Sequence, residues 1–162
     1  MLTWQHPTYF VTRKYSEATP AALRQLIARN RYHRTMPKYQ FKVEVKPQYL
    51  PEQSAPDQGI YTFAYTIRIT NTGTVAAQLI SRTWNVNDAN GLNEKIKGLG
   101  VVGHQPLLQP SEHFEYTSGT RLRTPTGTMH GSYFCVAEDG EKFDVDIPMF
   151  VLDALSNPRT LH

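Results

Sequence analysis

Tyr-Thr-Phe-Ala-Tyr-Thr-Ile-Arg-Ile-Thr, residues 61–70, alternates large apolar side chains with small or polar ones along its whole length. In an extended chain, Tyr61, Phe63, Tyr65, Ile67 and Ile69 fall on one side, and the residues between them fall on the other. A repeat of two is that of a β-strand, whereas a helix would place apolar residues every three or four positions. This stretch therefore predicts a strand with one face in a hydrophobic core.

The same repeat appears before and after this strand. It predicts strands at residues 41–45, 76–87, 129–137 and 143–147, and shorter extended pieces at 94–97 and 113–117. Within 76–87 the parity of Leu79 disagrees with that of Trp84, which a β-bulge or a strand covered on both faces would explain. We expect Pro47 to belong to a loop and Pro148 to end the last strand, because proline has no amide to donate to a ladder.

The number and spacing of these strands indicate the fold class. About seven strands with turn signals every 8 to 12 residues are typical of an all-β, immunoglobulin- or fibronectin type III-like β-sandwich. Trp84, in an early-middle strand, suits the buried tryptophan of such sandwiches. We expect one domain of this kind over residues 36–162.

A short basic segment precedes the predicted sandwich. Residues 19–34 read as a helix, with Thr19 as N-cap and Pro20 at the first helical position. Residues 1–38 hold seven Lys and Arg against one Glu, whereas the remainder holds ten basic and thirteen acidic side chains. The arginines of this segment either contact phosphates or an acidic partner, or form a solvated face. The mildly acidic main domain is not expected to bind nucleic acid.

Several classes of protein are disfavoured by the composition. No stretch approaches the roughly 20 apolar residues that span a bilayer, and the N-terminus lacks the pattern of a secretory signal, so we expect a cytoplasmic protein without a membrane partner. Cys135 is the single cysteine, which excludes an intrachain disulfide and a CxxC pair. We interpret it as a core residue, with a reactive thiol as the alternative.

Nine short blocks, in order, resemble the bacterial ApaG family. They are YLPEQS at 49–54, YTI at 65–67, NTG at 71–73, QLISR at 78–82, DANG at 88–91, GLGVVG at 98–103, QP at 105–106, FEYTSG at 114–119 and GSY at 131–133. The resemblance runs from about Met36 to His162. It implies a small fibronectin type III-like sandwich without an established enzymatic activity. It also implies a link, by genetic association, to cobalt and magnesium tolerance and to diadenosine tetraphosphate metabolism.

Residues 1–35 lie outside this resemblance, whose members commonly begin at a position matching Met36. The charge pattern and the period both change near the same point. We therefore expect residues 1–35 to be an extension that begins at an upstream start or does not belong to the native protein.

Residues 98–103, Gly-Leu-Gly-Val-Val-Gly, fit the pattern GxGxxG. The resemblance to the ApaG family implies that this stretch is a candidate pyrophosphate-binding motif. In a dinucleotide-binding fold this motif works because a helix begins in it. Here Pro106 and Pro110 exclude a following helix, so only a nest of backbone amides remains, with charge from Lys95, Lys97 or His104. The alternative is that Gly98, Gly100 and Gly103 let a connection cross the end of the sandwich.

Metal and catalytic sites are weakly indicated. The six histidines show no HxH or HxxxH pairing, and the acids fall mostly in turns, so we expect neither a metal nor a cofactor. There is no GxSxG, no HExxH and no cysteine with an identifiable base, so we expect no enzyme. The sequence favours a binding module for another protein, or for a second copy as a homodimer. The alternative is a binder of pyrophosphate or a nucleotide at residues 98–103.

Overall fold

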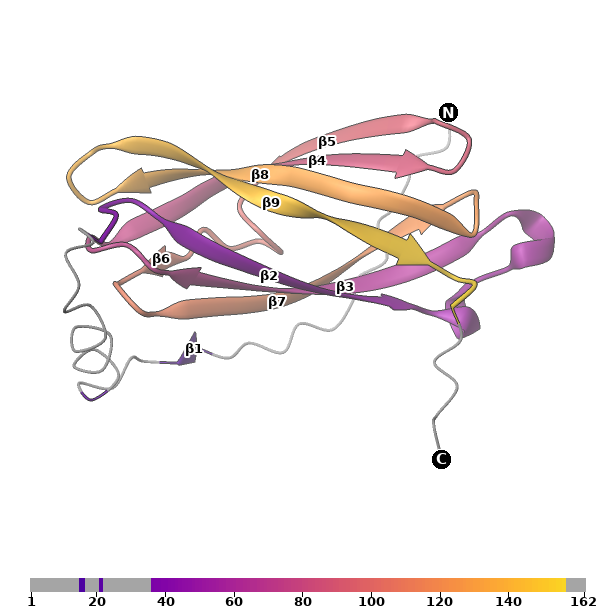
Figure 1. Cartoon of the computed structure of the whole chain (residues 1–162), viewed down its shortest axis with the longest axis horizontal. Coiled ribbons are helices and arrows are strands. Elements are labelled where there is room, and N and C mark those ends of the chain that lie inside the picture. Colours follow the sequence, from indigo (N-terminus) through magenta and orange to yellow (C-terminus); the bar gives the residue numbers. More distant parts are fainter. Residues whose placement is uncertain (1–14, 17–20, 22–35, 157–162) are drawn as a thin grey trace.

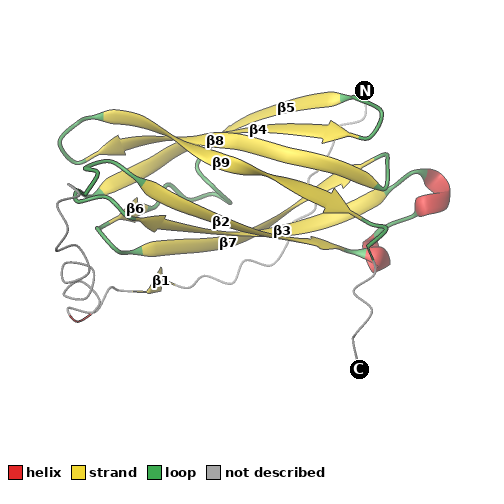
Figure 2. Cartoon of the chain, in the orientation of Figure 1, coloured by secondary structure: helices red, strands yellow, loops and turns green. Residues whose placement is uncertain are grey.

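Two antiparallel β-sheets packed face to face form this computed structural model, which describes residues 15–16, 21 and 36–156 (Figures 1 and 2). One sheet has the order β1 (Tyr15–Ser16), β7 (His113–Leu122), β3 (Tyr61–Asn71), β2 (Phe41–Tyr49). The other has the order β5 (Asn93–Leu99), β4 (Ala77–Asp88), β8 (Thr126–Ala137), β9 (Lys142–Asp153), with β6 (Leu107–Leu108) also paired to β4. Two 3₁₀ turns, η1 (Pro51–Gln53) and η2 (Pro56–Gln58), join β2 to β3. The prediction of an all-β sandwich is confirmed. The predicted helix at 19–34, apart from residue 21, lies outside the described residues.

The core lies between the sheets and is made by the alternating residues that the sequence singled out. β3 contributes Phe63, Ile67 and Ile69, each at most 1% exposed, and β8 contributes Met129 and Tyr133. Burial of such side chains is the main favourable contribution to folding. Other enclosed residues include Leu79, Leu108, Phe114, Tyr116, Cys135 and Leu152.

The parity conflict in β4 is resolved by a bulge. The pairing of β4 with β8 shifts register between Leu79 and Ser81, which leaves Ile80 as the extra residue. Leu79 and Trp84 can then both point into the core, where they are 0% and 2% exposed. Of the two explanations, the structure selects the bulge.

Two expectations about prolines are wrong. β2 continues through Pro47 to Tyr49, because β2 is the outermost strand of its sheet and Pro47 pairs with Tyr65 on one side only. β9 continues through Pro148 to Asp153, because its register with β8 shifts between Met129 and Gly131 and absorbs the proline in that irregularity. β9 also lies at a sheet edge. Prolines at edges and bulges do not end a strand.

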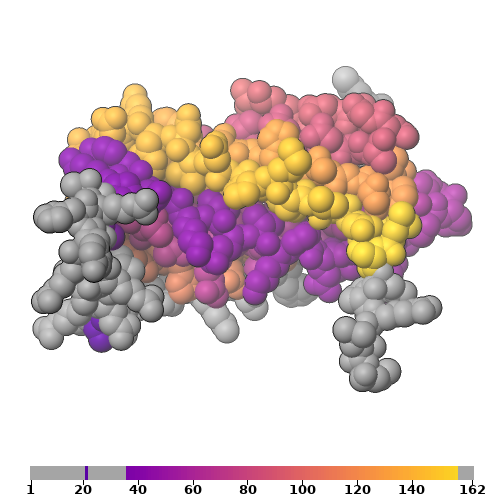
Figure 3. All heavy atoms as spheres, viewed as in Figure 1, coloured from indigo at the N-terminus to yellow at the C-terminus, as the bar shows by residue number. Residues whose placement is uncertain are grey.

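The sheets come together along the side where β2 meets β9, called here the closed side (Figure 3). The ring of Phe143 on β9 lies 5.7 Å from that of Tyr39 and 5.8 Å from that of Phe41. At the same end, Asp139 accepts a hydrogen bond of 2.6 Å from the Tyr39 hydroxyl and pairs with Lys38 at 2.9 Å. Aromatic and polar contacts therefore join the two sheets here.

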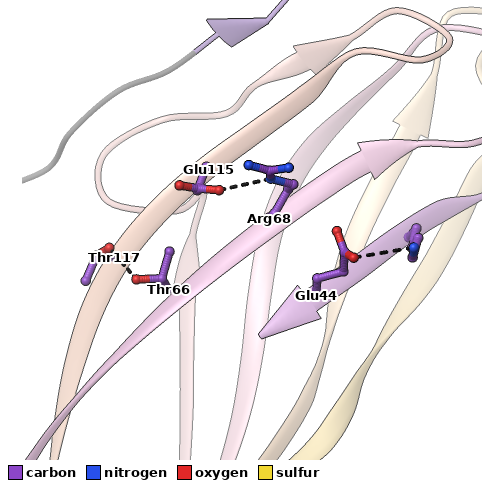
Figure 4. Close-up of polar contacts among 6 residues, drawn as sticks. Glu44, Thr66, Arg68, Glu115 and Thr117 are labelled. Atoms are coloured by element: carbon purple, nitrogen blue, oxygen red, sulfur yellow. Dashed lines mark hydrogen bonds and ion pairs between the residues drawn. The ribbon is translucent and has the colours of Figure 1, made fainter. Parts of the chain in front are cut away.

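The outward face of the β7-β3-β2 sheet carries ordinary surface pairs (Figure 4). Arg68 on β3 lies opposite Glu115 on β7, and its Nε donates to the carboxylate at 3.0 Å. The hydroxyls of Thr66 and Thr117 are 2.8 Å apart in the neighbouring register. Such cross-strand pairs stabilise a solvated sheet face modestly.

None of the helices among the described residues has the length and apolar character needed to cross a membrane.

Candidate ligand-binding site

The glycine-rich stretch folds as the end of a strand followed by a tight turn. Gly98 is the last residue but one of β5, and Gly100 has a φ of +59°, in the left-handed region. Val101 and His104 exchange backbone hydrogen bonds of 2.7 and 2.9 Å. The two residues between them, Val102 and Gly103, have φ of 44° and 78°, as in a type I′ turn. As the prolines predicted, no helix follows.

The amides of this stretch are largely used within the fold. The Gly100 amide donates to the Ile80 carbonyl at 2.8 Å, and those of Val101 and His104 donate to each other's carbonyls. A phosphate nest needs successive amides that converge on one point. These three amides are therefore not available to such a nest.

The carbonyls of the stretch instead face a cation, Arg82 of β4. The Nη1 of Arg82 donates to the carbonyl oxygens of Leu99 at 3.0 Å and Gly100 at 2.8 Å. Arg82 lies opposite Gly98 in the sheet, and a Cβ on Gly98 would be 2.9 Å from that Nη1 and 3.0 Å from Cζ. Gly98 thus leaves the room into which the guanidinium packs.

Arg82 borders a cavity of about 180 Å³ between the sheets, on the side where β5 and β7 are the nearest strands, called here the open side. Buried Tyr65, Trp84, Tyr116 and Met129 form part of its wall. Half-buried residues complete the lining: Ile96, Val102, Ser118, Gly119 and Thr120. The cavity combines an aromatic wall, two hydroxyl-bearing side chains and one cationic group.

The tyrosines near the cavity are neutral. The hydroxyls of Tyr116 and Tyr133 are 2.6 Å apart and buried, and burial raises the pKa of both far above the ordinary value. Burial also raises the pKa of Tyr65, against the lowering effects of a hydrogen bond with Ser118 and of the Arg82 charge. The charge at this site is therefore that of Arg82.

The three predicted charge donors lie elsewhere. Lys95 and Lys97 are exposed and pair with Asn85 and Thr83, so they lie on the outer face of the sheet, opposite to the face that Arg82 occupies. His104 is half-buried, with its ring 6.2 Å from that of Phe114. The structure thus brings Gly98 and Gly100 to Arg82, but it does not bring the lysines there.

Arg82 was missed in the sequence, although a signal was present. It shares parity with Trp84, which was expected to be buried, so an inward-pointing charge could have been predicted from the alternation. Its partner Gly98 could not, because the register between β4 and β5 is a tertiary property.

Other candidate groups do not form a site. Cys135 is fully buried, and burial raises the pKa of its thiol to about 12, which confirms the core interpretation. The structurally described part of the chain contains no group of three or more His, Cys, Asp or Glu side chains placed to hold a metal ion.

Comparison with known proteins identifies the family. A family model for the ApaG domain matches residues 51–137. The chain belongs to the ApaG family. It is 70% identical over 123 residues to the ApaG protein of Acidovorax sp. strain JS42, covering 75% of this chain and 90% of that protein. It is 57% identical over 127 residues to that of Ralstonia nicotianae, covering 78% of this chain and 100% of the relative.

Solved structures agree with this ApaG assignment. A crystal structure from Bordetella pertussis, described as an ApaA protein, superposes with a TM-score of 0.73 and 53% identity. It covers 78% of this chain and 100% of its own. Every residue that lines the cavity falls within the stretch matched by the ApaG domain model. The open side is therefore part of the ApaG domain itself.

Proposed function

We propose that this ApaG-family protein is a cytoplasmic binding module that acts on other proteins by association rather than by catalysis. The observation that carries the proposal is an outer apolar patch, defined as Leu99, Leu107, Phe134 and Val136. Leu99 and Leu107 are 75% and 54% exposed, and the other two are half-buried. Solvated faces of antiparallel sheets are usually polar, so such a cluster favours a contact surface.

The register places the four residues on one face. Leu99 and Phe134 both lie beside Ser81 of β4, and Leu107 and Val136 both lie beside Gln78. Residues directly opposite in a sheet point to the same side, so the patch spans β5, β6 and β8 at one end of the sheet. Asp144, paired with Phe134, gives it a charged border of the kind seen at interface rims.

The architecture is consistent with this role. We include in the proposal that the sandwich is of the immunoglobulin- or fibronectin type III-like kind, a scaffold that many binding domains share. The neutral state of Cys135 and of the buried Tyr116–Tyr133 pair removes three candidates for a nucleophile or base, which supports binding over catalysis.

The test is a comparative capture experiment with the full chain. We expect the double variant Leu99→Asp, Leu107→Asp to lose partners that the wild type retains from its source lysate, as identified by quantitative mass spectrometry. The matched control is Leu155→Asp, a change at another exposed leucine, 71% exposed, outside the patch. Partners lost equally in the control, or retained by the double variant, would reject the patch. Light scattering of the same proteins identifies the case in which the partner is a second copy.

A second candidate function is the binding of pyrophosphate or a nucleotide at residues 98–103. It is favoured by Lys95 and Lys97, two exposed cations on the strand that leads into the loop, neither of which forms an ion pair with another described residue. Calorimetry with pyrophosphate, ATP and diadenosine tetraphosphate tests it. Saturable heat that Lys95→Gln, Lys97→Gln weakens would support this function, and the absence of heat would reject it.

A further inference from the structure

Arg82 and Arg68 both lie on strands of the sandwich, but their guanidinium groups have different partners. Arg68 points outward and donates to the carboxylate of Glu115 at 3.0 Å. Arg82 points inward, and within the described residues it has no carboxylate partner, only the carbonyls of Leu99 and Gly100. A half-buried cation held by neutral acceptors keeps an unmet preference for a negative charge.

The donors of Arg82 are divided in a way that suits an anion. Both carbonyls accept from Nη1, which leaves Nε and Nη2 without an acceptor among the residues that the structure describes. These two nitrogens lie on one edge of the planar guanidinium. That edge is the fork that binds a carboxylate through two parallel hydrogen bonds.

The space beside Arg82 has the size and chemistry of a small ligand. The cavity is about 180 Å³, below the roughly 300–1,000 Å³ of pockets for drug-sized ligands, and a cavity of about 150 Å³ holds a benzene molecule. Trp84, Tyr116 and Ile96 provide an apolar wall. Ser118 and Thr120 provide hydroxyls that can orient a polar group.

We propose that the open side of the sandwich is a binding site for a carboxylate, held by the guanidinium fork of Arg82 with its apolar body against Trp84 and Tyr116. One cation with neutral hydroxyls beside it matches a single negative charge. A phosphate group with close to two charges would find too little compensation here, and a nucleotide would exceed the space. The site is distinct from the outer apolar patch and from the amides of residues 98–103.

A small residue keeps this site open. Gly98 lies opposite Arg82 in the sheet and leaves space for its guanidinium. A Cβ on Gly98 would come within 2.9–3.0 Å of three guanidinium atoms. Because Arg82 is the flexible partner, Gly98→Ala shifts the guanidinium and leaves the backbone in place.

The test uses the full chain, labelled with ¹⁵N, and benzoate as the probe at constant ionic strength. We expect saturable shifts of the amide signals of residues 98–103 and 118–120 and of the Arg82 Nε–H signal. Benzamide, of the same shape and without charge, should bind about tenfold more weakly or worse, since a charge-assisted hydrogen bond contributes at least that factor. No saturable shift, or equal binding of benzamide, would overturn the proposal.

Variants assign the effect to Arg82. Arg82→Gln should weaken benzoate binding by about tenfold to a hundredfold, and Gly98→Ala by a smaller factor. Arg68→Gln, the matched loss of an arginine charge on the outer face, should change it by less than about twofold, because surface charges at a distance are screened. If Arg82→Gln does not fold, Arg82→Lys keeps the charge without the fork and is judged on the same scale. Unchanged affinity in the Arg82 variant would reject the site.

Two further arms identify the source of the carboxylate. A short peptide that ends in phenylalanine with a free carboxylate, compared with its amidated form, reports on a protein terminus as the ligand. Tighter binding of the free-carboxylate peptide than of benzoate assigns the site to a protein terminus, and the reverse assigns it to a free small acid. Pyrophosphate that displaces benzoate at a lower concentration than benzoate itself requires would show a phosphate site and overturn the carboxylate proposal.

Discussion

The closed and open sides of the sandwich differ in how the space between the two sheets is filled. On the closed side, the ring of Phe143 packs edge-to-face against that of Phe41 and at a tilt against that of Tyr39. On the open side, Ser118, Gly119 and Thr120 of β7 line a cavity whose wall also includes aromatic rings. Aromatic rings fill the space between the sheets at one edge, whereas a cavity of about 180 Å³ remains at the other. The two edges of the core are therefore packed unevenly.

The charges follow the same division. Asp139 and Lys38 on the closed side meet each other directly at 2.9 Å. Arg82 on the open side is held only by carbonyls of its own sheet. The charged groups on the closed side thus form an ion pair, whereas the charge of Arg82 on the open side has no ionic partner among the described residues. Three pairs of variants test this comparison.

The largest expected effect comes from the closed side. Phe41→Ala removes a ring that is 7% exposed and packs edge-to-face against Phe143, so we expect the free energy of unfolding to fall by about 4 kcal/mol in urea denaturation. Ile96→Ala on the open side is the control. Its side chain is half-buried and already borders a cavity, so its loss should cost only about 1 kcal/mol. Equal costs would break the distinction between the two sides.

An intermediate effect comes from the glycines beside the open side. Gly100→Ala forces a side chain onto a φ of +59° and places its Cβ 2.2 Å from the His104 carbonyl oxygen, so we expect a loss of about 3 kcal/mol. Gly103→Ala shares the positive φ, but nothing lies within 4 Å of its Cβ, and the loss should be about 1 kcal/mol. Thermal unfolding of both proteins measures the pair, and a larger loss at Gly103 would contradict the role assigned to Gly100.

The smallest effect concerns pH on the closed side. The hydrogen bonds from Tyr39 and Lys38, with the Glu141 amide, lower the pKa of Asp139 to about 2, from an unfolded value near 3.8. Because the folded value is the lower one, the stabilisation is fully present above about pH 4 and is lost as pH falls through about 2. The gap in urea midpoint between wild type and Asp139→Asn should close over that interval.

A donor variant checks the cause of this pH effect. Tyr39→Phe removes the hydrogen bond that lowers the pKa of Asp139 most and should reduce the gap at neutral pH as well. A gap that stays constant from pH 6 to 2 would show that Asp139 contributes nothing through its charge. Because the carboxylate is exposed, the expected change is small.

The sequence predicted the strands that alternate regularly and failed where a strand tolerates an irregularity. Phe63, Tyr65, Ile67 and Ile69 on β3 are buried as the alternation predicts, although Thr62 and Ala64 of the other face are buried as well. Met129 to Ala137 on β8 alternate around one buried face. Pro47 and Pro148 were misread because their tolerance depends on edge position and on a register shift, which the order of strands decides. The alternation of residues within a strand indicates which face is buried, but it does not indicate which strands lie on either side.

The sequence singled out residues 98–103 as a candidate phosphate-binding site, and the structure places part of this stretch beside the cavity. The spacing of Gly98, Gly100 and Gly103 drew attention to the stretch through a phosphate-binding pattern. The structure gives two of them other tasks, since Gly98 accommodates Arg82 and Gly100 approaches His104. The cation itself lies sixteen residues earlier, brought there by the pairing of β4 with β5. The glycine spacing thus led to a stretch whose closest side-chain partner, Arg82, lies outside the motif.

The meeting of β2 with β9 has a consequence for how the protein is made. β2 is the first strand of the continuous described segment and β9 is the last, so the closed side joins the two ends of the domain. During translation Phe41 leaves the ribosome early, and its contact with Phe143 cannot form until nearly the whole domain has been synthesised. Contacts between such distant positions form slowly, and until they form the aromatic side chains of β2 are exposed to other chains. We therefore expect the aromatic side chains of β2 to be protected from aggregation only after β9 has been synthesised and has packed against them.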